Sequence, residues 1–139
     1  MQNPPPVQMT QMPKSSTGLD ENVAAVLSYV FNWVSGLVFF LIEKESRLVR
    51  FHAMQSLILA VVFFVGMIAL YIVWAILAII TSQISGLLAT LVGLVVGLLI
   101  FVFFIAAVIG WILGMVKAYQ GQFFKLPVIG NFAEKFSTK

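Results

Sequence analysis

A run of 64 consecutive residues, from residue 53 to residue 116, contains no aspartate, glutamate, lysine, arginine or histidine. Soluble domains carry charge at about a quarter of their positions, so an uncharged run of this length would arise by chance with a probability on the order of 10⁻⁸. As a continuous helix it would extend for about 96 Å, roughly three times the hydrocarbon core of a bilayer. The run therefore predicts at least two membrane crossings.

The composition of the whole chain fits one membrane domain. Of its 139 residues, 61% are hydrophobic and 9% are charged, and the mean hydropathy is +1.06. No segment outside the apolar runs is long enough to bury a separate soluble core. We expect a disordered, proline-rich tail over residues 1–22, a transmembrane helical domain over residues 23–118 and a cytoplasmic amphipathic tail over residues 119–139.

Three apolar segments divide the transmembrane domain. They cover residues 23–42, 53–80 and 87–116, and each is long enough to cross a bilayer as a helix. The small and polar residues 81–86 are the only turn signal in the uncharged run, so the second and third segments should form an antiparallel helical hairpin. The fold class is thus all-α, a polytopic helical membrane protein with about three membrane segments.

The first segment allows two interpretations. Its polar and small side chains share one helical face, which favours a seam where another helix packs. Alternatively, residues 32–36 are the turn of a re-entrant helical hairpin, which lipid tolerates only if protein covers the freed backbone groups. The residues of this face are Ser28, Asn32, Ser35 and Gly36.

Glycines in the third segment are candidates for close helix packing. Gly93 and Gly97 form one G-x-x-x-G pair, and Gly110 and Gly114 form another. Gly97 and Gly114 are separated by about 100° around the helix, so the two pairs should face different neighbours.

The densest polar stretch lies where the chain enters the second segment. Two interpretations remain open: a proton-handling or partner-binding cluster around His52, or an interfacial anchor of mutually compensating charges. The residues of this juxtamembrane cluster are Glu43, Lys44, Arg47, Arg50, His52 and Gln55.

Basic residues predict the orientation. The loop at residues 43–52 and the chain after the third segment hold seven of the eight lysines and arginines, whereas the turn at residues 81–86 has none. The positive-inside rule therefore places that loop and the C-terminus in the cytoplasm, with the protein in the cell membrane as a multi-pass protein. A full first crossing would put the N-terminal tail outside, and a re-entrant segment would keep it inside.

The tail after residue 121 predicts a short interfacial helix. Val128, Phe132 and Phe136 recur every four residues, which makes one apolar face. Such a helix would lie on the cytoplasmic face of the membrane, with Lys125, Lys135 and Lys139 toward the headgroups.

Enzymatic chemistry is not predicted. The chain has no cysteine and one histidine, so an all-protein zinc site is not expected, and no cofactor motif, phosphate loop or intramembrane carboxylate pair is present. The eight basic residues flank apolar runs and do not form a nucleic-acid surface, so we expect no nucleic-acid partner. The expected partners are the lipid bilayer and other membrane helices.

Three strings carry a family resemblance: LIEKES at residues 41–46, VRFHAMQS at residues 49–56 and LPVIG at residues 126–130. They resemble a family of small prokaryotic membrane proteins of unknown function, similar to the Tic-twenty-like proteins, whose plastid members are subunits of the inner-envelope import translocon. The resemblance covers nearly all of the chain after residue 20 and implies no catalytic residue.

The expected function is that of a packing subunit in a membrane oligomer or a translocation-type complex. The alternative is a small accessory membrane protein that binds a cytosolic partner or anionic lipid through its basic loop and tail.

Overall fold

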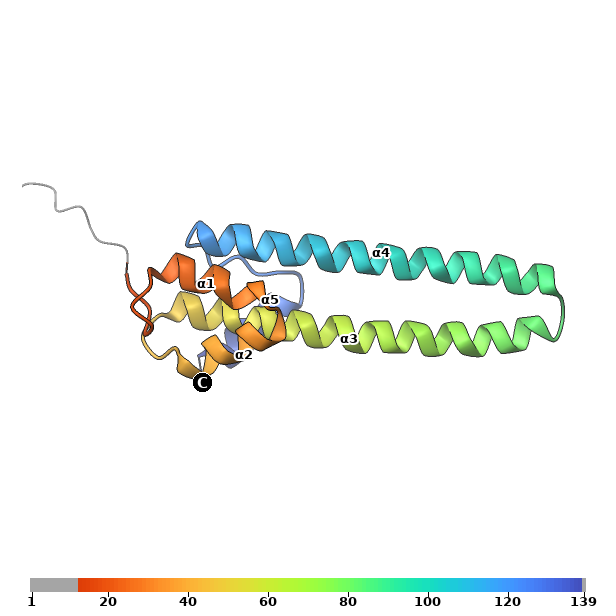
Figure 1. Cartoon of the computed structure of the whole chain (residues 1–139), viewed down its shortest axis with the longest axis horizontal. Helices are drawn as coiled ribbons and strands as arrows, with labels where there is room; N and C mark the ends of the chain where they lie inside the picture. Colours follow the sequence, from red (N-terminus) through yellow and green to blue (C-terminus); the bar gives the residue numbers. More distant parts are fainter. Residues whose placement is uncertain (1–12, 139) are drawn as a thin grey trace, which may run out of the picture.

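The computed structural model describes residues 13–138, and this range folds into five α-helices (Figure 1). Two of them, α3 and α4, are long and apolar enough to cross a membrane, and α2 is a shorter apolar helix. The predicted helical membrane class is confirmed. The helices are α1 (Glu21–Val30), α2 (Trp33–Ile42), α3 (Arg47–Ser82), α4 (Gly86–Tyr119) and α5 (Ile129–Ser137).

Helices α3 and α4 form the predicted hairpin. They have 36 and 34 residues, more than the apolar segments themselves, because α3 starts in the polar loop at its Ser46 cap and α4 continues past Lys117. The Ser46 hydroxyl accepts a hydrogen bond from the Val49 N–H at 3.3 Å, as N-cap residues do. At 1.5 Å per residue the two helices measure about 54 and 51 Å, so they exceed the hydrocarbon core and reach the headgroup region.

The first apolar segment is broken at Asn32. This residue has a φ of +56°, and it separates α1 from α2. Asparagine is enriched in that backbone region because its short side chain is tolerated there. The hinge is covered by protein: the Asn32 carbonyl accepts from the Ser56 hydroxyl of α3 at 3.1 Å, and the Ser35 hydroxyl accepts from the Phe31 N–H at 3.0 Å. Of the two interpretations of this segment, the break is the one that the structure contains.

Helices α1 and α2 fold back on each other so that both outer ends lie at one end of the molecule (Figure 1). The Ser46 hydroxyl donates to the Glu21 carboxylate at 2.7 Å, which joins the start of α1 to the start of α3. Each helix has ten residues, so the pair extends for about 15 Å, half of a hydrocarbon core. These are the dimensions of a re-entrant hairpin. We call the end where it starts and finishes the base.

The predicted C-terminal helix is present as α5, and it packs against α3. After α4 ends at the base, residues 121–128, which we call the arm, return toward the middle of α3. Ile129, at the start of α5, lines a small cavity with Leu59 and Phe63 of α3, whereas Ser137, at the end of α5, bonds Arg50 at the base. Helix α5 therefore packs antiparallel to α3. Hydrogen bonds from Gln55 to the arm and from Arg50 to the end of α5 hold this arrangement.

The α1–α2 hairpin, the arm and α5 surround the basal halves of α3 and α4, and the far half of the α3–α4 hairpin extends alone (Figure 1). Side chains there are exposed in the isolated chain, for example Val65 at 62%, Ile79 at 66% and Leu94 at 66%. In a membrane protein such surfaces contact lipid or other helices.

Part of the predicted N-terminal tail is structured. Residues 1–12 lie outside the described range, but residues 13–20 form a turn in which the Ser15 N–H donates to the Leu19 carbonyl at 2.8 Å. The Ser16 hydroxyl donates to the Glu43 carboxylate at 2.7 Å. The turn is held at the base by these bonds, so a disordered tail does not extend to residue 22.

Candidate functional site

A buried polar network lies inside the basal half of the molecule, where α1, α3 and the arm meet. Its members Tyr29, His52 and Gln55 have no exposed surface. The Tyr29 hydroxyl lies 3.0 Å from His52 Nδ1, and Gln55 Nε2 donates to the same hydroxyl at 3.0 Å. His52 Nε2 lies 2.7 Å from the Gln122 carbonyl oxygen of the arm. The network joins three segments that are far apart in the sequence.

The geometry of the network determines the positions of its protons. A carbonyl oxygen only accepts, so His52 Nε2 carries hydrogen and donates to Gln122. Gln55 donates to the Tyr29 oxygen, which leaves the Tyr29 hydroxyl to donate to Nδ1 of a neutral His52 imidazole. Each member is satisfied by this single pattern, so the network fixes the relative positions of α1 and α3.

Gln55 also holds the arm. Its Nε2 donates to the Phe124 carbonyl at 3.2 Å, and its Oε1 accepts from the Leu126 N–H at 3.1 Å. These two bonds satisfy backbone groups of a segment with no secondary structure of its own. Backbone groups at membrane depth require such partners, so one side chain permits the arm to fold back into the molecule.

Glu43 organises the base. Its buried carboxylate accepts from the Ser16 hydroxyl, the Ser16 N–H and the Ser46 N–H at 2.7 to 3.0 Å. Burial raises the pKa of the Glu43 carboxyl, but these donors and the Glu45 N–H lower it by more, so the pKa lies below its usual value. The carboxylate is therefore ionised at neutral pH, where it joins the N-terminal turn to the loop before α3.

Arg50 ties the ends of α2 and α5 to α3. Its guanidinium donates to the Glu43 carbonyl at 2.8 Å and to the Ser137 carbonyl at 3.2 Å. The guanidinium carbon lies 4.6 Å from the centre of the Phe40 ring. These contacts give Arg50 a structural role at the base, because the carbonyls at helix ends lack partners within their own helices.

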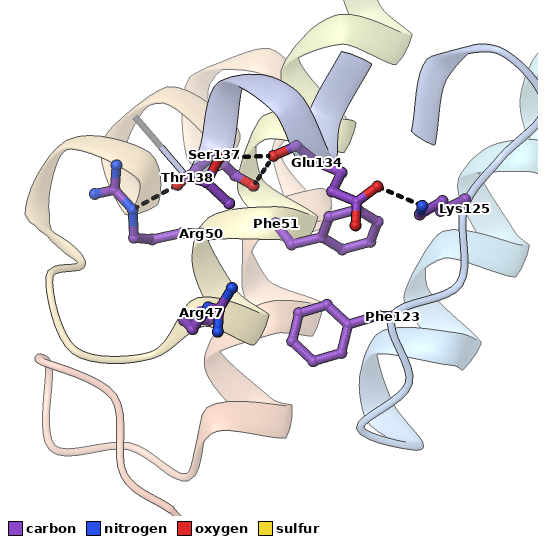
Figure 2. A pocket seen from close by; sticks show the side chains of 8 residues that line it. All are labelled: Arg47, Arg50, Phe51, Phe123, Lys125, Glu134, Ser137 and Thr138. Carbon is purple, nitrogen blue, oxygen red and sulfur yellow. Dashed lines mark hydrogen bonds and ion pairs between the residues drawn. The ribbon is translucent and has the colours of Figure 1, made fainter. Parts of the chain in front are cut away.

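A cleft of about 700 Å³ opens at the base between the first turns of α3, the arm and the end of α5 (Figure 2). Figure 2 shows the two arginines on one side, the ion pair of Lys125 and Glu134 on the other, and the aromatic rings between them. The residues that define the cleft are Arg47, Arg50, Lys125, Glu134, Phe51 and Phe123.

The predicted juxtamembrane cluster is divided between these places. His52 and Gln55 share the buried network, but Glu43 is not part of it and bonds the N-terminal turn. Lys44 is exposed outside the cleft, whereas Arg47 and Arg50 line it. Among residues 13–138, the ion pairs are Lys14 with Asp20 and Lys125 with Glu134. The cluster residues therefore do not act as one group: two join the buried network, one holds the N-terminal turn, and two line the cleft.

The predicted packing residues also separate by place. Gly36 lies against the α3 backbone, where an added Cβ would be 3.0 Å from the Ala53 carbonyl oxygen. Ser28 is buried, with its hydroxyl bonded to the Ala25 carbonyl at 2.6 Å.

The four paired glycines of α4 differ in what lies beside them. A Cβ on Gly114 would be 2.7 Å from the Tyr29 ring, and a Cβ on Gly110 would be 3.9 Å from Leu126. A Cβ on Gly93 would be 3.9 Å from Trp74 Nε1 of α3, whereas a Cβ on Gly97 would meet no atom within 4 Å. Gly97 is thus the only one of these four glycines whose face is open.

Three important residues were not among the predicted site residues. Tyr29 is the centre of the buried network, Trp111 donates from Nε1 to the Tyr29 carbonyl at 2.8 Å, and Phe123 lines the cleft. The spacing of His52 and Gln55 places them on one face of a helix and was a usable signal. Nothing in the local sequence connects them with Tyr29, which is 23 residues away from His52.

The sequence matches the model of a known protein family. The model of the magnetosome magnetite crystal formation protein family matches residues 19–133. The chain belongs to this family. The matched range contains α1 to α4 and the first half of α5.

Relatives of this family member are named membrane proteins. A UPF0132 membrane protein of Methanocaldococcus jannaschii is 43% identical over 131 residues, which cover 93% of this chain and 99% of the relative. A second from the same organism is 42% identical, with 86% and 71% covered, and one from Archaeoglobus fulgidus is 41% identical, with 84% and 95% covered. No solved structure matches the chain. The chain is an integral membrane protein of a small family, as predicted.

Proposed function

We propose that the chain is a non-enzymatic subunit that assembles with other membrane helices, as a homo- or hetero-oligomer, through the open face of α4. The carrying observation is Gly97. Three of the four paired glycines are in contact within the chain, but Gly97 meets nothing, and small residues on membrane helices permit close contact with a neighbouring helix. Two spanning helices do not enclose a water-filled pore, so any role in translocation would require this assembly.

Gly97→Ile tests this proposal. The branched side chain should keep a neighbouring helix away and weaken self-association at least about tenfold, since loss of close packing costs on the order of 1.4 kcal/mol. Sedimentation velocity of the purified protein in mild detergent gives the oligomeric state. Ala75→Ile is the matched control, because Ala75 is an exposed small residue of α3. A wild-type protein that is strictly monomeric in detergent and in crosslinked native membranes would overturn the proposal.

The resemblance and the family description suggest two kinds of partner, another translocation component and a mineral. The Tic-twenty-like resemblance is compatible with a translocation-type complex, and it stays a prediction. The family description concerns magnetite crystal formation. In this chain Asp20 and Glu134 pair with lysines, Glu21 accepts from Ser46, and Glu43 accepts from backbone and hydroxyl donors. Four of the five acidic side chains thus have partners within the fold and Glu45 is the exposed fifth, so the geometry supports assembly better than mineral binding.

We further propose that the base faces the cytoplasm of a cell membrane. The basic residues of the described range lie in the segments that form the base and the cleft, and the turn at the other end of the hairpin has none.

Single-cysteine variants test this orientation, because the chain has no cysteine of its own. A membrane-impermeant maleimide should label Gln83→Cys from outside intact cells, and it should label Thr17→Cys and Lys44→Cys only after permeabilisation. All three residues are exposed, which makes their reactivities comparable. Labelling of Thr17→Cys together with Gln83→Cys would mean that residues 23–42 cross the membrane fully.

The cleft favours a second candidate function, that of an accessory membrane protein that binds a cytosolic partner or anionic lipid. Among the described residues that line the cleft, Arg47, Arg50 and Lys125 are basic and Glu134 is acidic, so positive charge is in excess. This candidate does not depend on oligomer formation.

A further inference from the structure

The basic cleft has the composition of an anion site. Arg47 and Arg50 are one helical turn apart on α3, so their side chains emerge from the same face. Across the cleft, Lys125 is paired with Glu134, which leaves the arginine side with a net positive charge. An anion that enters the cleft would therefore meet the Arg47 guanidinium, which has no ion pair with another residue of the described range.

Arg47 is the side chain that is available to a ligand. It is exposed, and it has no hydrogen bond or ion pair with any other residue in the described range. Arg50, in contrast, is oriented by the Glu43 and Ser137 carbonyls. The exposed Arg47 side chain suits a phosphate group, because guanidiniums bind phosphate oxygens with paired, charge-assisted hydrogen bonds.

We expect the cleft to lie at the level of the lipid headgroups. The uncharged run begins one residue after His52, and Arg47, Arg50 and Phe51 stand immediately before it on the same helix. Juxtamembrane arginines at this position are held beside anionic headgroups.

Apolar surfaces border the cleft at the same level. Arg50 bonds the carbonyls of Phe40 in α2 and Ser137 in α5. The side chains next to these residues in sequence are exposed apolar ones, Leu41 at 64% and Phe136 at 43%. The Phe51 and Phe123 rings, whose centres are 5.5 Å apart, form an apolar part of the cleft wall. A ligand here would need a charged head and an apolar body.

We propose that the cleft binds the phosphate of an anionic phospholipid, with the Arg47 guanidinium as the direct contact. The volume of about 700 Å³ accommodates a phosphoglycerol headgroup, and the flanking Leu41 and Phe136 side chains would contact its acyl chains. This inference specifies the ligand of the second candidate function and does not require oligomer formation.

Native mass spectrometry of the full chain, with phosphatidylglycerol or phosphatidylcholine added in mild detergent, tests the site. The wild type should retain phosphatidylglycerol about tenfold more strongly than phosphatidylcholine. Arg47→Gln should remove that preference, since one charge-assisted contact has about that effect. Lys44→Gln is the matched control: it removes the same charge three residues earlier, from an exposed side chain outside the cleft.

Each alternative gives a distinct result. Equal losses in Arg47→Gln and Lys44→Gln would mean that diffuse surface charge attracts the lipid, and the site would be rejected. If millimolar inorganic phosphate or glycerol phosphate competes as effectively as phosphatidylglycerol does, the cleft binds a soluble anion. That result would overturn the proposal of a lipid ligand. Because lipid is counted per protomer, a monomeric protein that still prefers phosphatidylglycerol would refute the proposed assembly and leave this inference intact.

Discussion

Gly114→Ala is expected to destabilise the protein by about 1–3 kcal/mol, the usual cost of an inserted methyl group in a packed interior. The added Cβ would lie 2.7 Å from Tyr29 Cε1 and 2.8 Å from Cζ, well inside van der Waals contact. The Tyr29 ring has no simple way to move, because it is fully buried and its hydroxyl bonds both His52 and Gln55. Either α1 must leave α4 or the buried network must break.

Thermal unfolding in mild detergent measures this effect, and hydrogen exchange over residues 21–30 locates it. Gly86→Ala is the matched control in the same helix, since its Cβ would also meet no atom within 4 Å and Gly86 has no part in the proposed assembly, so its stability should remain within about 0.5 kcal/mol of the wild type. If the two variants unfold at the same temperature, Tyr29 does not pack against α4 as described.

Gln55→Leu should release the arm from the core, at a cost of about 2–5 kcal/mol. Leucine has a similar size, so the main change is the loss of hydrogen bonds to the Phe124 carbonyl, the Leu126 N–H and the Tyr29 hydroxyl. The two backbone groups of the arm would be left without these partners, and each buried group of this kind costs about 1–3 kcal/mol.

Hydrogen exchange gives the most direct readout, because the Leu126 amide donates to Gln55 and should exchange much faster in the variant. Gln83→Leu makes the same substitution at an exposed position in the α3–α4 turn and should leave the arm protected. A Gln55→Leu protein with an unchanged Leu126 exchange rate would show that other contacts hold the arm, such as the burial of Leu126 itself.

The membrane class, the hairpin and the charged end of the molecule could all be predicted from local features. The uncharged run required lipid, and its one polar interruption at residues 81–86 located the turn, which the structure places at residues 83–85. Helix periodicity also found a C-terminal helix over residues 129–137. These features depend on residues close together in the sequence, so composition and spacing are sufficient to find them.

The candidate site was predicted only in part. The polar entry to α3 was identified, but its residues have different fates: His52 and Gln55 turn inward, Glu43 binds the N-terminal turn, and Arg47 faces a cleft. Which way each side chain points depends on the segments that pack against α3. The cleft itself requires α5, whose return toward the base depends on Gln55.

The sequence by itself determined that the 64-residue uncharged run lies in lipid, because no soluble domain has an uncharged stretch of this length. Only the tertiary structure decided that the first segment turns back at Asn32 and that the tail returns along α3. Both results depend on hydrogen bonds between residues distant in the chain, such as Ser56 with Asn32 and Leu126 with Gln55. Local pattern contains no signal for such bonds, whereas exposed backbone at membrane depth requires them.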